Sequence, residues 1–198
     1  SIPESLSLTN IVYMGMGEPF DNFDAVLQSI QVLTSEWGVA MSPRRITVST
    51  VGVIPGIREF MEKTECHLAV SLHAPTGDKR SQIMPMQKAY PHSEIVRMLR
   101  KYDWSGQRRL SFEYIVFKDF NDDEENAGKL VKLLHHLKCR VNLIRFHVSE
   151  GVPLEGVDMD KMIAFRDCLS NEGIICTIRA SRGEDIMAAC GLLAGKME

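Results

Sequence analysis

Six short runs rich in β-branched residues alternate along the chain with longer segments whose apolar residues recur at helical spacing. We expect strands at Asn10–Met14, Arg45–Val53, Cys66–His73, Arg109–Phe117, Arg140–His147 and Ile174–Arg179. We expect helices at Phe23–Trp37, Pro55–Lys63, Ser93–Tyr102, Asp123–Leu137, Met159–Asn171 and Glu184–Ala194. Strands that alternate with helices form right-handed crossovers and therefore a parallel sheet. Because no linker interrupts the series, the sequence predicts a single α/β domain over residues 1–198.

Composition and charge exclude several classes of protein. Of the 198 residues, 44% are hydrophobic and 25% are charged, which is typical of a folded domain. No apolar run approaches the ~18 residues of a membrane span, and the amino-terminal residues lack the pattern of a signal peptide. We therefore expect a cytoplasmic protein with no membrane partner. The net charge of -3 gives no general attraction for a phosphate backbone, so nucleic-acid binding requires a local patch or a part of the protein outside this chain.

The cysteines are few and scattered. They are Cys66, Cys139, Cys168, Cys176 and Cys190, and no two of them form a CxxC or CxxxC pair. This spacing disfavours a disulfide scaffold and a self-contained zinc or iron–sulfur site. We expect reduced thiols and no metal ligands within the chain.

The first predicted strand runs into the motif GMGEP at residues 15–19. Sites in parallel α/β folds gather at the carboxyl ends of the strands. The two glycines allow a sharp turn that leaves backbone groups open to a ligand, and Glu18 supplies an anionic acceptor. A purely structural turn would use the same residue types, so the motif alone does not define a site.

Strand alternation places polar side chains on one face of four successive predicted strands. They are Thr47 and Ser49; His67, Ser71 and His73; Ser111 and Glu113; and Arg145 with His147, opposite Asn142. A lone polar residue in a strand is commonly a hydrogen-bonded core group. Four such strands in succession favour one shared cavity, because burial of unpaired polar groups costs several kcal/mol.

Three other segments stay open between a structural and a functional role. We expect the charged segment 76–91 to be a solvated connection between strand and helix. Cys190 lies among small residues on the last predicted helix, where a buried thiol is a sufficient explanation. Residues 179–185 place two arginines before two acidic residues, which can hold an anion or cap a helix.

Taken in order, the motifs of this chain resemble the RlmN/Cfr family. They are NIVYMGMGEP at 10–19, RRITVST at 44–50 with GVIP at 52–55, AVSLHAP at 69–75, NLI at 142–144, and RGED at 182–185 followed by AACG at 188–191. Members of this family are radical S-adenosylmethionine enzymes that methylate C2 or C8 of an adenine in ribosomal RNA. The resemblance implies a partial TIM-like barrel of the radical S-adenosylmethionine type, truncated at its amino-terminal side.

The resemblance also implies a cofactor pocket and a methyl carrier. The pocket comprises Gly17, Glu18, Ser49, Ser71, Leu72, His73 and His147. Cys190 matches the family cysteine that receives a methyl group and passes it to the RNA base. Because adenine C2 is not nucleophilic, a radical on the protein-bound methyl carbon must attack it, and the cofactor supplies that radical.

Two departures from the family pattern limit what this chain does alone. The CxxxCxxC triplet that holds the family's [4Fe–4S] cluster is absent, so its ligands are expected outside this chain and the isolated chain is expected to be inactive. We expect the carboxyl-terminal part of a longer protein, which binds ribosomal RNA, with transfer RNA as a further candidate, and a reductase such as flavodoxin or ferredoxin. An exposed edge strand at Asn10–Met14 predicts self-association.

The second departure is His147, which stands where the family usually has an asparagine that contacts the cofactor. Histidine also donates or accepts a hydrogen bond. Two alternatives to the ribosomal enzyme therefore stay open: an RlmN-like paralogue that acts on a different substrate, and a non-catalytic α/β binding module.

Overall fold

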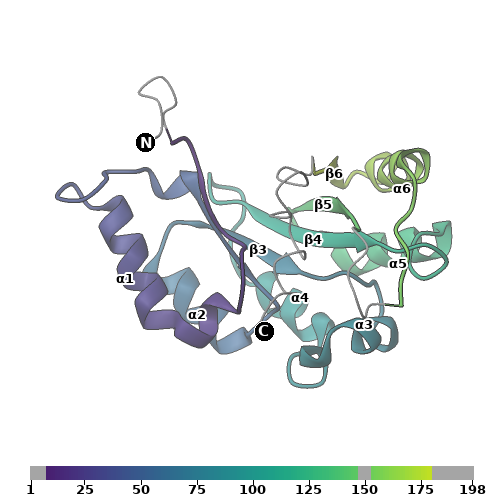
Figure 1. Ribbon diagram of the computed structural model, residues 1–198, viewed down its shortest axis with the longest axis horizontal. Coiled ribbons are helices and arrows are strands. Elements are labelled where there is room, and N and C mark those ends of the chain that lie inside the picture. Colours follow the sequence, from purple (N-terminus) through teal and green to yellow (C-terminus); the bar gives the residue numbers. More distant parts are fainter. Residues whose placement is uncertain (1–7, 147–152, 180–198) are drawn as a thin grey trace.

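The computed structural model describes residues 8–146 and 153–179, and Figure 1 shows their arrangement. The strands are β1 (Ile11–Tyr13), β2 (Ile46–Thr50), β3 (His67–Ser71), β4 (Leu110–Val116), β5 (Arg140–Arg145) and β6 (Ile175–Ile178). The α-helices are α1 (Phe23–Thr34), α2 (Ile54–Lys63), α3 (Gly77–Ile83), α4 (His92–Leu99), α5 (Glu124–Leu134) and α6 (Met159–Asn171). Single turns of 3-10 helix are η1 (Pro19–Asn22), η2 (Pro43–Arg45) and η3 (Pro85–Gln87).

The six strands form one parallel sheet in the order β1-β2-β3-β4-β5-β6. This confirms the predicted α/β fold, and each strand overlaps its predicted range. The register aligns Ser71 with Glu113, Glu113 with Asn142, and Asn142 with Thr177. Residues at the same level of a sheet point to the same face. One row of polar side chains therefore crosses four neighbouring strands.

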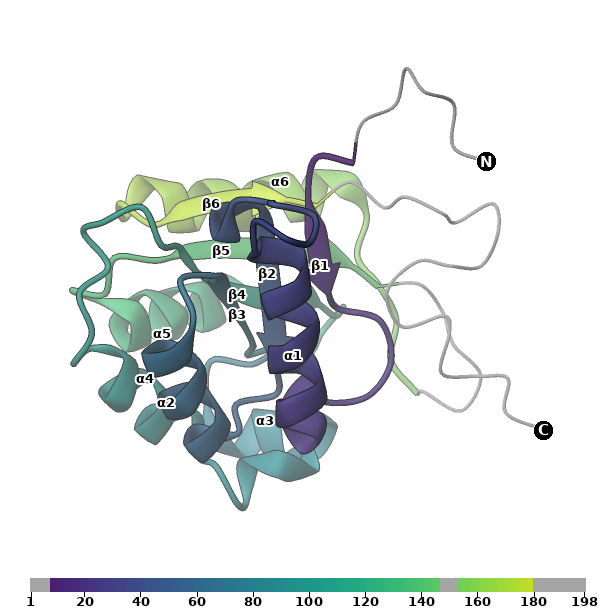
Figure 2. The same cartoon turned by 90° about the vertical axis from the view of Figure 1, so that its left-hand side faces the viewer.

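The helices cover one face of the sheet, as Figures 1 and 2 show. On β2 to β5 the alternate residues on this face are buried and form a core with the apolar sides of the helices. Leu68, Phe112 and Leu143 are examples, each at most 1% exposed. The apolar periodicity thus fixes which side of each strand faces the helices, and it leaves the polar row on the opposite, inner face.

Three of the α-helices have a side-chain cap at their amino-terminal end. The side chains of Thr76, Asp123 and Asp158 accept hydrogen bonds from backbone N–H groups in the first turns of α3, α5 and α6. Such caps satisfy donors that have no partner within the helix. After the other end of α6, Gly173 has a φ of 83°, the left-handed conformation that commonly ends a helix.

The sheet curls so that its two outermost strands approach each other. Arg179, directly after β6, donates a hydrogen bond from a guanidinium nitrogen to the sulfur of Met14, directly after β1, at 3.3 Å. A flat sheet of six strands is about 24 Å wide, which one arginine side chain does not bridge. The sheet is therefore strongly curved, as the predicted partial barrel requires.

The structure corrects the expectation that segment 76–91 is a solvated connection. This segment contains α3 and η3, and the side chain of Arg80 within it is completely buried. The start of α3 has a recognisable signal, because Thr76 is a favourable capping residue followed by Gly77 and Asp78.

A second correction concerns the face of β5. Arg145 was predicted on the polar inner face, opposite Asn142. Asn142 instead lies on the inner face, where its side chain contacts Glu113, and Arg145 is exposed on the other side. The two buried residues Val141 and Leu143 determine this orientation, because they must face the helices.

Several expectations fall outside the described residues or stay open. His147, Cys190 and the helix predicted at Glu184–Ala194 lie outside the described ranges. Among the described strands β1 is at the edge of the sheet, so self-association along it stays a prediction. No helix within residues 8–146 and 153–179 is long and apolar enough to cross a membrane.

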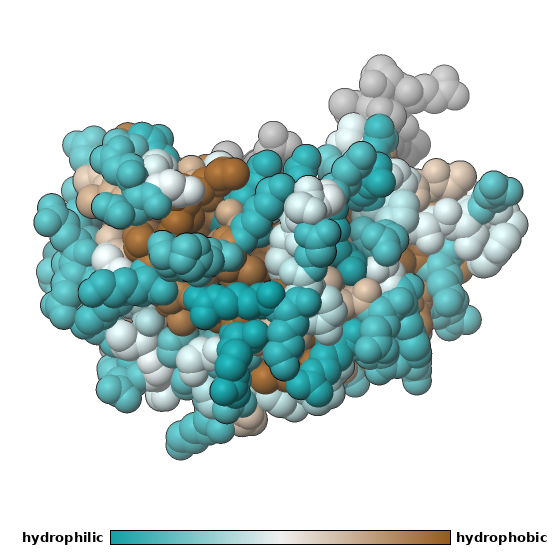
Figure 3. Space-filling view, turned by 180° about the vertical axis from the view of Figure 1, so that it is seen from behind, coloured by the Kyte–Doolittle hydropathy of each residue, from teal (hydrophilic) through white to brown (hydrophobic). Residues whose placement is uncertain are grey.

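The face seen from behind Figure 1 is mostly hydrophilic, and its hydrophobic residues gather toward the side where α5 and α6 lie (Figure 3). On the described surface, Met159 at the start of α6 and Ile175 on β6 are two of the exposed large hydrophobic residues. Scattered exposure of this kind is ordinary for a folded domain.

Candidate functional site

The inner face of the curled sheet surrounds a hollow of about 330 Å³, which we call the inner hollow. It is lined by Val12, Met14, Thr47, His67, Arg109, Ser111, Glu113, Arg140, Asn142, Thr177 and Arg179. All of these residues lie on strands or within two residues of a strand end. The predicted convergence of polar strand residues on one cavity is therefore confirmed for Thr47, His67, Ser111 and Glu113.

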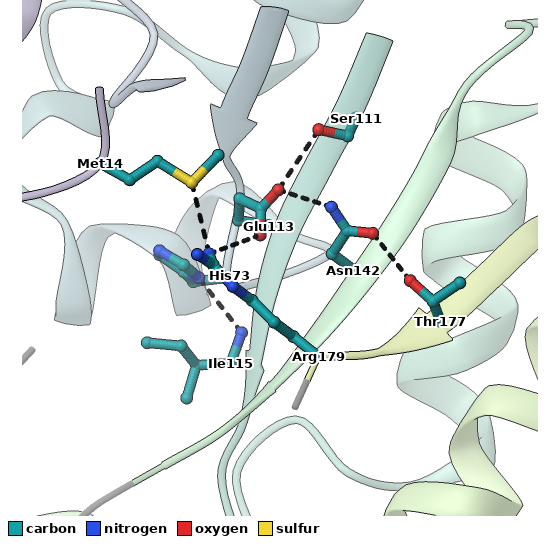
Figure 4. Close-up of polar contacts among 8 residues, drawn as sticks. All are labelled: Met14, His73, Ser111, Glu113, Ile115, Asn142, Thr177 and Arg179. Atoms are coloured by element: carbon teal, nitrogen blue, oxygen red, sulfur yellow. Dashed lines mark hydrogen bonds and ion pairs between the residues drawn. The ribbon is translucent and has the colours of Figure 1, made fainter. Parts of the chain in front are cut away.

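Glu113 lies at the centre of a hydrogen-bonded row on the inner face (Figure 4). Its Oε1 accepts from Asn142 Nδ2 at 2.8 Å and from Ser111 Oγ at 3.3 Å. Thr177 Oγ1 in turn donates to Asn142 Oδ1 at 2.8 Å. These bonds fix the amide orientation of Asn142 and hold the Glu113 carboxylate in one position.

The second carboxylate oxygen of Glu113 is buried and accepts no hydrogen bond from the described residues. Among the described residues Oε2 forms an ion pair with Arg179, whose guanidinium nitrogen lies 3.8 Å away. Burial raises the pKa of Glu113, and the contacts with Asn142 and Arg179 oppose that rise. A buried acceptor without a donor is unfavourable, so Oε2 is suited to receive an N–H or O–H group of a ligand.

His73 stands at the carboxyl end of β3 in the left-handed conformation, with a φ of 57°. Its Nδ1 accepts the backbone N–H of Ile115 at 3.2 Å. Burial, and secondarily the charge of Arg80, lower the pKa of His73 to about 4. The ring is therefore neutral at neutral pH and carries its hydrogen on Nε2, which makes His73 a hydrogen-bond donor.

Asn121 holds the backbone around His73 in place. Its Nδ2 donates to the carbonyl oxygens of His73 and Ile115, each at 2.8 Å, and its Oδ1 accepts the N–H of Phe117 at 2.7 Å. A left-handed non-glycine residue is strained and persists only when its surroundings determine it. The backbone of His73 is thus set by a specific, fully buried side chain.

Glu18 of the GMGEP motif joins the ends of β1 and β2. Its Oε2 accepts the backbone N–H of Val51 at 2.7 Å, and its Oε1 accepts the N–H of Phe20 at 3.2 Å. A carboxylate has about four acceptor positions, so room is left for a ligand donor. Gly17 beside it has a φ of 77°, and open space lies where a side chain would start.

The other predicted pocket residues differ in what they present. Ser49 and Ser71 are half-buried on strands β2 and β3, on the inner face. Leu72 is 1% exposed, so its side chain belongs to the core. Its N–H donates to the carbonyl of Glu113, and its carbonyl accepts from Arg80.

Sequence reasoning missed three residues that shape this region: Met14, Asn121 and Thr177. It singled out residues 179–185 for holding an anion or capping a helix, but did not place Arg179 beside Glu113. It placed Glu113 on the polar face but did not include it among the pocket residues. Thr177 could have been found from the alternation along β6, where it lies between the half-buried Cys176 and Ile178. The contacts of Met14 with Arg179 have no local signal, because the two residues are 165 positions apart.

Known proteins with similar sequences and similar folds agree with this architecture. No family model matches the chain. It is 57% identical over 194 residues to a probable dual-specificity RNA methyltransferase RlmN of Phocaeicola vulgatus, an alignment that covers 98% of this chain and 56% of the relative. The chain thus spans about half the length of the curated relatives it matches.

Two solved structures have an architecture similar to that of this chain. A radical SAM methyltransferase from Sphaerobacter thermophilus superposes with a TM-score of 0.89 at 42% identity, over 95% of this chain and 55% of that one. A domain of pyruvate-formate lyase-activating enzyme from Bacteroides vulgatus gives 0.65 at 15% identity, over 87% of this chain and 100% of that one, a likeness of fold alone.

The curled parallel sheet, its outer helices and its polar inner face therefore define part of a barrel of the radical S-adenosylmethionine type. Within that class, the resemblance to the RlmN/Cfr family is confirmed over almost the whole length of the chain. In the described residues, no three or more His, Cys, Asp or Glu side chains come together as a metal site.

Proposed function

We propose that this chain is the single-domain, cofactor-binding part of a longer radical S-adenosylmethionine methyltransferase. In this proposal the enzyme methylates C2 of an adenine in ribosomal RNA, with transfer RNA as a further candidate substrate, and Cys190 carries the methyl group. The observation that carries the proposal is the row of ordered acceptors on the inner face, centred on Glu113, in a chain 57% identical to an RlmN.

The described residues fit S-adenosylmethionine. The cofactor offers donors in its ammonium group, its ribose hydroxyls and its adenine amine. The chain presents matching acceptors in the carboxylate of Glu18 and in Oε2 of Glu113, which accepts no hydrogen bond from the described residues. His73 presents a neutral donor for a ribose oxygen or a ring nitrogen. Positive φ at Gly17 leaves space for a ligand to approach the backbone.

When bound, S-adenosylmethionine and a [4Fe–4S] cluster supply the radical chemistry, with cluster ligands outside this chain and electrons from a flavodoxin or ferredoxin. The residues of this chain bind and orient. Glu18, His73 and Glu113 fix the position of the cofactor, and Cys190 accepts and delivers the methyl group.

A second hollow suits the RNA backbone. This basic hollow of about 430 Å³ lies at the amino-terminal ends of the strands, and Arg44, Arg109, Lys138 and Arg140 are among its lining residues. Burial lowers the pKa of His67 in its wall, and the charges of Arg109, Arg108 and Arg140 lower it further. The local potential is therefore positive despite the net charge of -3, as contact with phosphates requires.

Labelled methyl transfer tests the proposed chemistry. The complete polypeptide, with its cluster restored, is given methyl-labelled S-adenosylmethionine, and the label is located by peptide mass spectrometry. We expect label on Cys190, none in a Cys190→Ala variant, and full label on Cys190 in the matched Cys176→Ala variant. Label that stays absent from Cys190 in an enzyme that methylates RNA would overturn its assignment as the carrier.

Charge reversal tests the RNA surface. We expect Arg44→Glu to weaken RNA binding and to reduce the slope of log affinity against log salt by about 1, since one phosphate contact is lost. Lys132→Glu on α5 changes the net charge equally at an exposed position outside the basic hollow, and should leave the slope unchanged. Equal effects of the two variants would show that this hollow does not contact RNA.

His147 supports one further candidate function, an RlmN-like paralogue that acts on a different RNA. It replaces the asparagine usual in the family. Methylation of ribosomal RNA that lacks the modification decides between the two. If Cys190 is labelled but this RNA gains no methyl group at an adenine C2, the paralogue is correct.

A further inference from the structure

We infer that Arg80 is a positioning residue that sets the shape of the cofactor pocket by binding the strand-end carbonyls of β2 and β3. The inference rests on the proposed function, and extends it to a residue that touches neither cofactor nor substrate. Arg80 lies on α3 and belongs to none of the motifs that carry the resemblance to the family. The motif before it in the chain is AVSLHAP, which ends at residue 75.

The guanidinium of Arg80 joins two strand ends that approach the pocket. One terminal nitrogen donates to the carbonyl of Val51, after β2, at 2.6 Å and to that of Ser71, in β3, at 3.0 Å. Its Nε donates to the carbonyl of Leu72 at 3.2 Å. The other terminal nitrogen donates to Gln87 Oε1 at 2.9 Å.

These carbonyls belong to the peptide segments that carry the proposed pocket residues. Val51 donates its N–H to the carboxylate of Glu18, and Ser71 and Leu72 directly precede His73. A movement of the guanidinium would therefore shift the Glu18 anchor and the His73 ring together. One side chain thereby determines the distance between the two sides of the pocket.

Arg80 is a buried cation that is stabilised by backbone carbonyls. The side chain is 0% exposed, and no acidic residue of the described chain pairs with it. Burial lowers its pKa to about 10, so it stays charged at neutral pH. Charge-assisted bonds to carbonyl dipoles offset the desolvation, and loss of the cation would leave several buried carbonyls without a donor.

Lysine does not reproduce this arrangement. The planar guanidinium presents five donors in a fixed fork, and five different carbonyl or amide oxygens at up to 3.4 Å, that of Tyr90 included, use them here. An ammonium group has three donors around a single atom. Arg80→Lys keeps the charge but cannot span the β2 and β3 ends at once.

Arg108, which lies just before β4, offers a matched control. It also binds backbone carbonyls, with Nε donating to Cys66 at 2.9 Å and a terminal nitrogen donating to Met61 at 3.1 Å. Its acceptors lie in the last turn of α2 and just before β3, near the amino-terminal end of that strand, whereas those of Arg80 lie at the carboxyl-terminal strand ends. Loss of either fork should lower stability, but only one lies beside the pocket.

The experiment compares Arg80→Lys with Arg108→Lys in the complete polypeptide. Thermal unfolding reports stability, and calorimetric titration with S-adenosylmethionine reports affinity. We expect both variants to unfold at lower temperature. We expect Arg80→Lys to raise the Kd for S-adenosylmethionine about tenfold or more, as when support for a binding site is loosened, and Arg108→Lys to leave it within about twofold.

Hydrogen exchange gives a readout that does not depend on the cofactor. In Arg80→Lys we expect faster exchange of the backbone N–H groups of Val51, Leu72 and His73, and no such change in Arg108→Lys. If Arg80→Lys fails to fold, Gln87→Leu, which removes one acceptor of the fork, should give the same pattern with a smaller rise in Kd.

The outcomes separate this inference from the proposed function. Binding by the parent with equal Kd in the two lysine variants overturns the role of Arg80 and leaves the cofactor assignment intact. A parent with its cluster restored that binds no S-adenosylmethionine overturns the proposed function. If the parent binds no S-adenosylmethionine, hydrogen exchange still tests Arg80. Unchanged exchange at Val51 and His73 in Arg80→Lys would overturn the positioning of these strand ends by Arg80.

Discussion

Replacement of Glu18 by glutamine tests whether this carboxylate ties β1 to β2. Each of its oxygens accepts a different backbone N–H, from Val51 at 2.7 Å and from Phe20 at 3.2 Å. Glutamine has the same shape but only one carbonyl oxygen. Its NH₂ group, itself a donor, would face the other of the two backbone N–H groups. The isosteric change therefore keeps one neutral bond and loses the other.

The magnitude follows from these two bonds. A hydrogen bond to a charged group contributes about 1.5–3 kcal/mol, and a neutral bond about 1 kcal/mol. Because Glu18 is only half-buried, the lower value applies to each bond, so Glu18→Gln should lower the free energy of unfolding by about 2 kcal/mol, and Glu18→Ala, which removes both bonds, by about 3 kcal/mol. Glu36→Gln, at an exposed glutamate outside these contacts, should change it by less than about 0.5 kcal/mol.

Urea denaturation of the protein without ligand measures these differences. With a slope of about 2 kcal/mol per molar urea, the midpoint should fall by about 1 M for Glu18→Gln and about 1.5 M for Glu18→Ala. A Glu18→Gln midpoint within about 0.2 M of the parent would refute the reasoning, because the second oxygen would then carry no structural bond.

Further expectations concern three other positions. Gly17→Ala should destabilise the protein by about 1–2 kcal/mol in the same urea assay, because an L side chain is strained at a φ of 77° even with open space around it; Gly17→Asn should lose less, and equal losses would point to a steric cause. Burial raises the pKa of Glu113, so the folded state holds this proton more tightly than the unfolded state, and this contribution to stability is lost as pH rises from 4.5 through the raised value. Glu113→Gln should flatten the dependence of unfolding free energy on pH in that window, and parallel curves would contradict the assignment. Burial raises the pKa of Cys66 to about 11, so iodoacetamide at pH 8 should label it slowly in the folded protein and rapidly in urea, as mass spectrometry can follow; rapid native labelling would show an accessible thiolate.

The sequence supports prediction of the strands because their signals are local. Each strand combines β-branched residues with turn residues at its ends, and the register follows from apolar residues such as Leu68 and Phe112 that must face the helices. The polar inner face follows from the same alternation. On β5 the prediction that Arg145 faces inward was wrong, because the buried pair Val141 and Leu143 turns Asn142 to the inner face.

Arg80 and the sheet curvature were not predictable in this way. Charged residues are rarely buried, so a segment with several of them is normally expected to lie in solvent. Only tertiary structure brings the carbonyls of Val51, Ser71 and Leu72 around one guanidinium. The contact between Met14 and Arg179 likewise depends on the accumulated curvature of six strands.

The order of the strands has a consequence for how the protein assembles. Because β1 to β6 pair in the order in which they are synthesised, each new strand adds to the sheet beside the previous one, and none has to insert between partners already paired. Such neighbour-by-neighbour contacts favour folding during synthesis. Arg179 follows the last strand and contacts Met14 beside the first. We therefore expect stalled chains that end before β6 to protect the amides of β2 and β3 from hydrogen exchange while leaving Glu113 accessible to water, so the inner hollow closes only after most of the fold has formed.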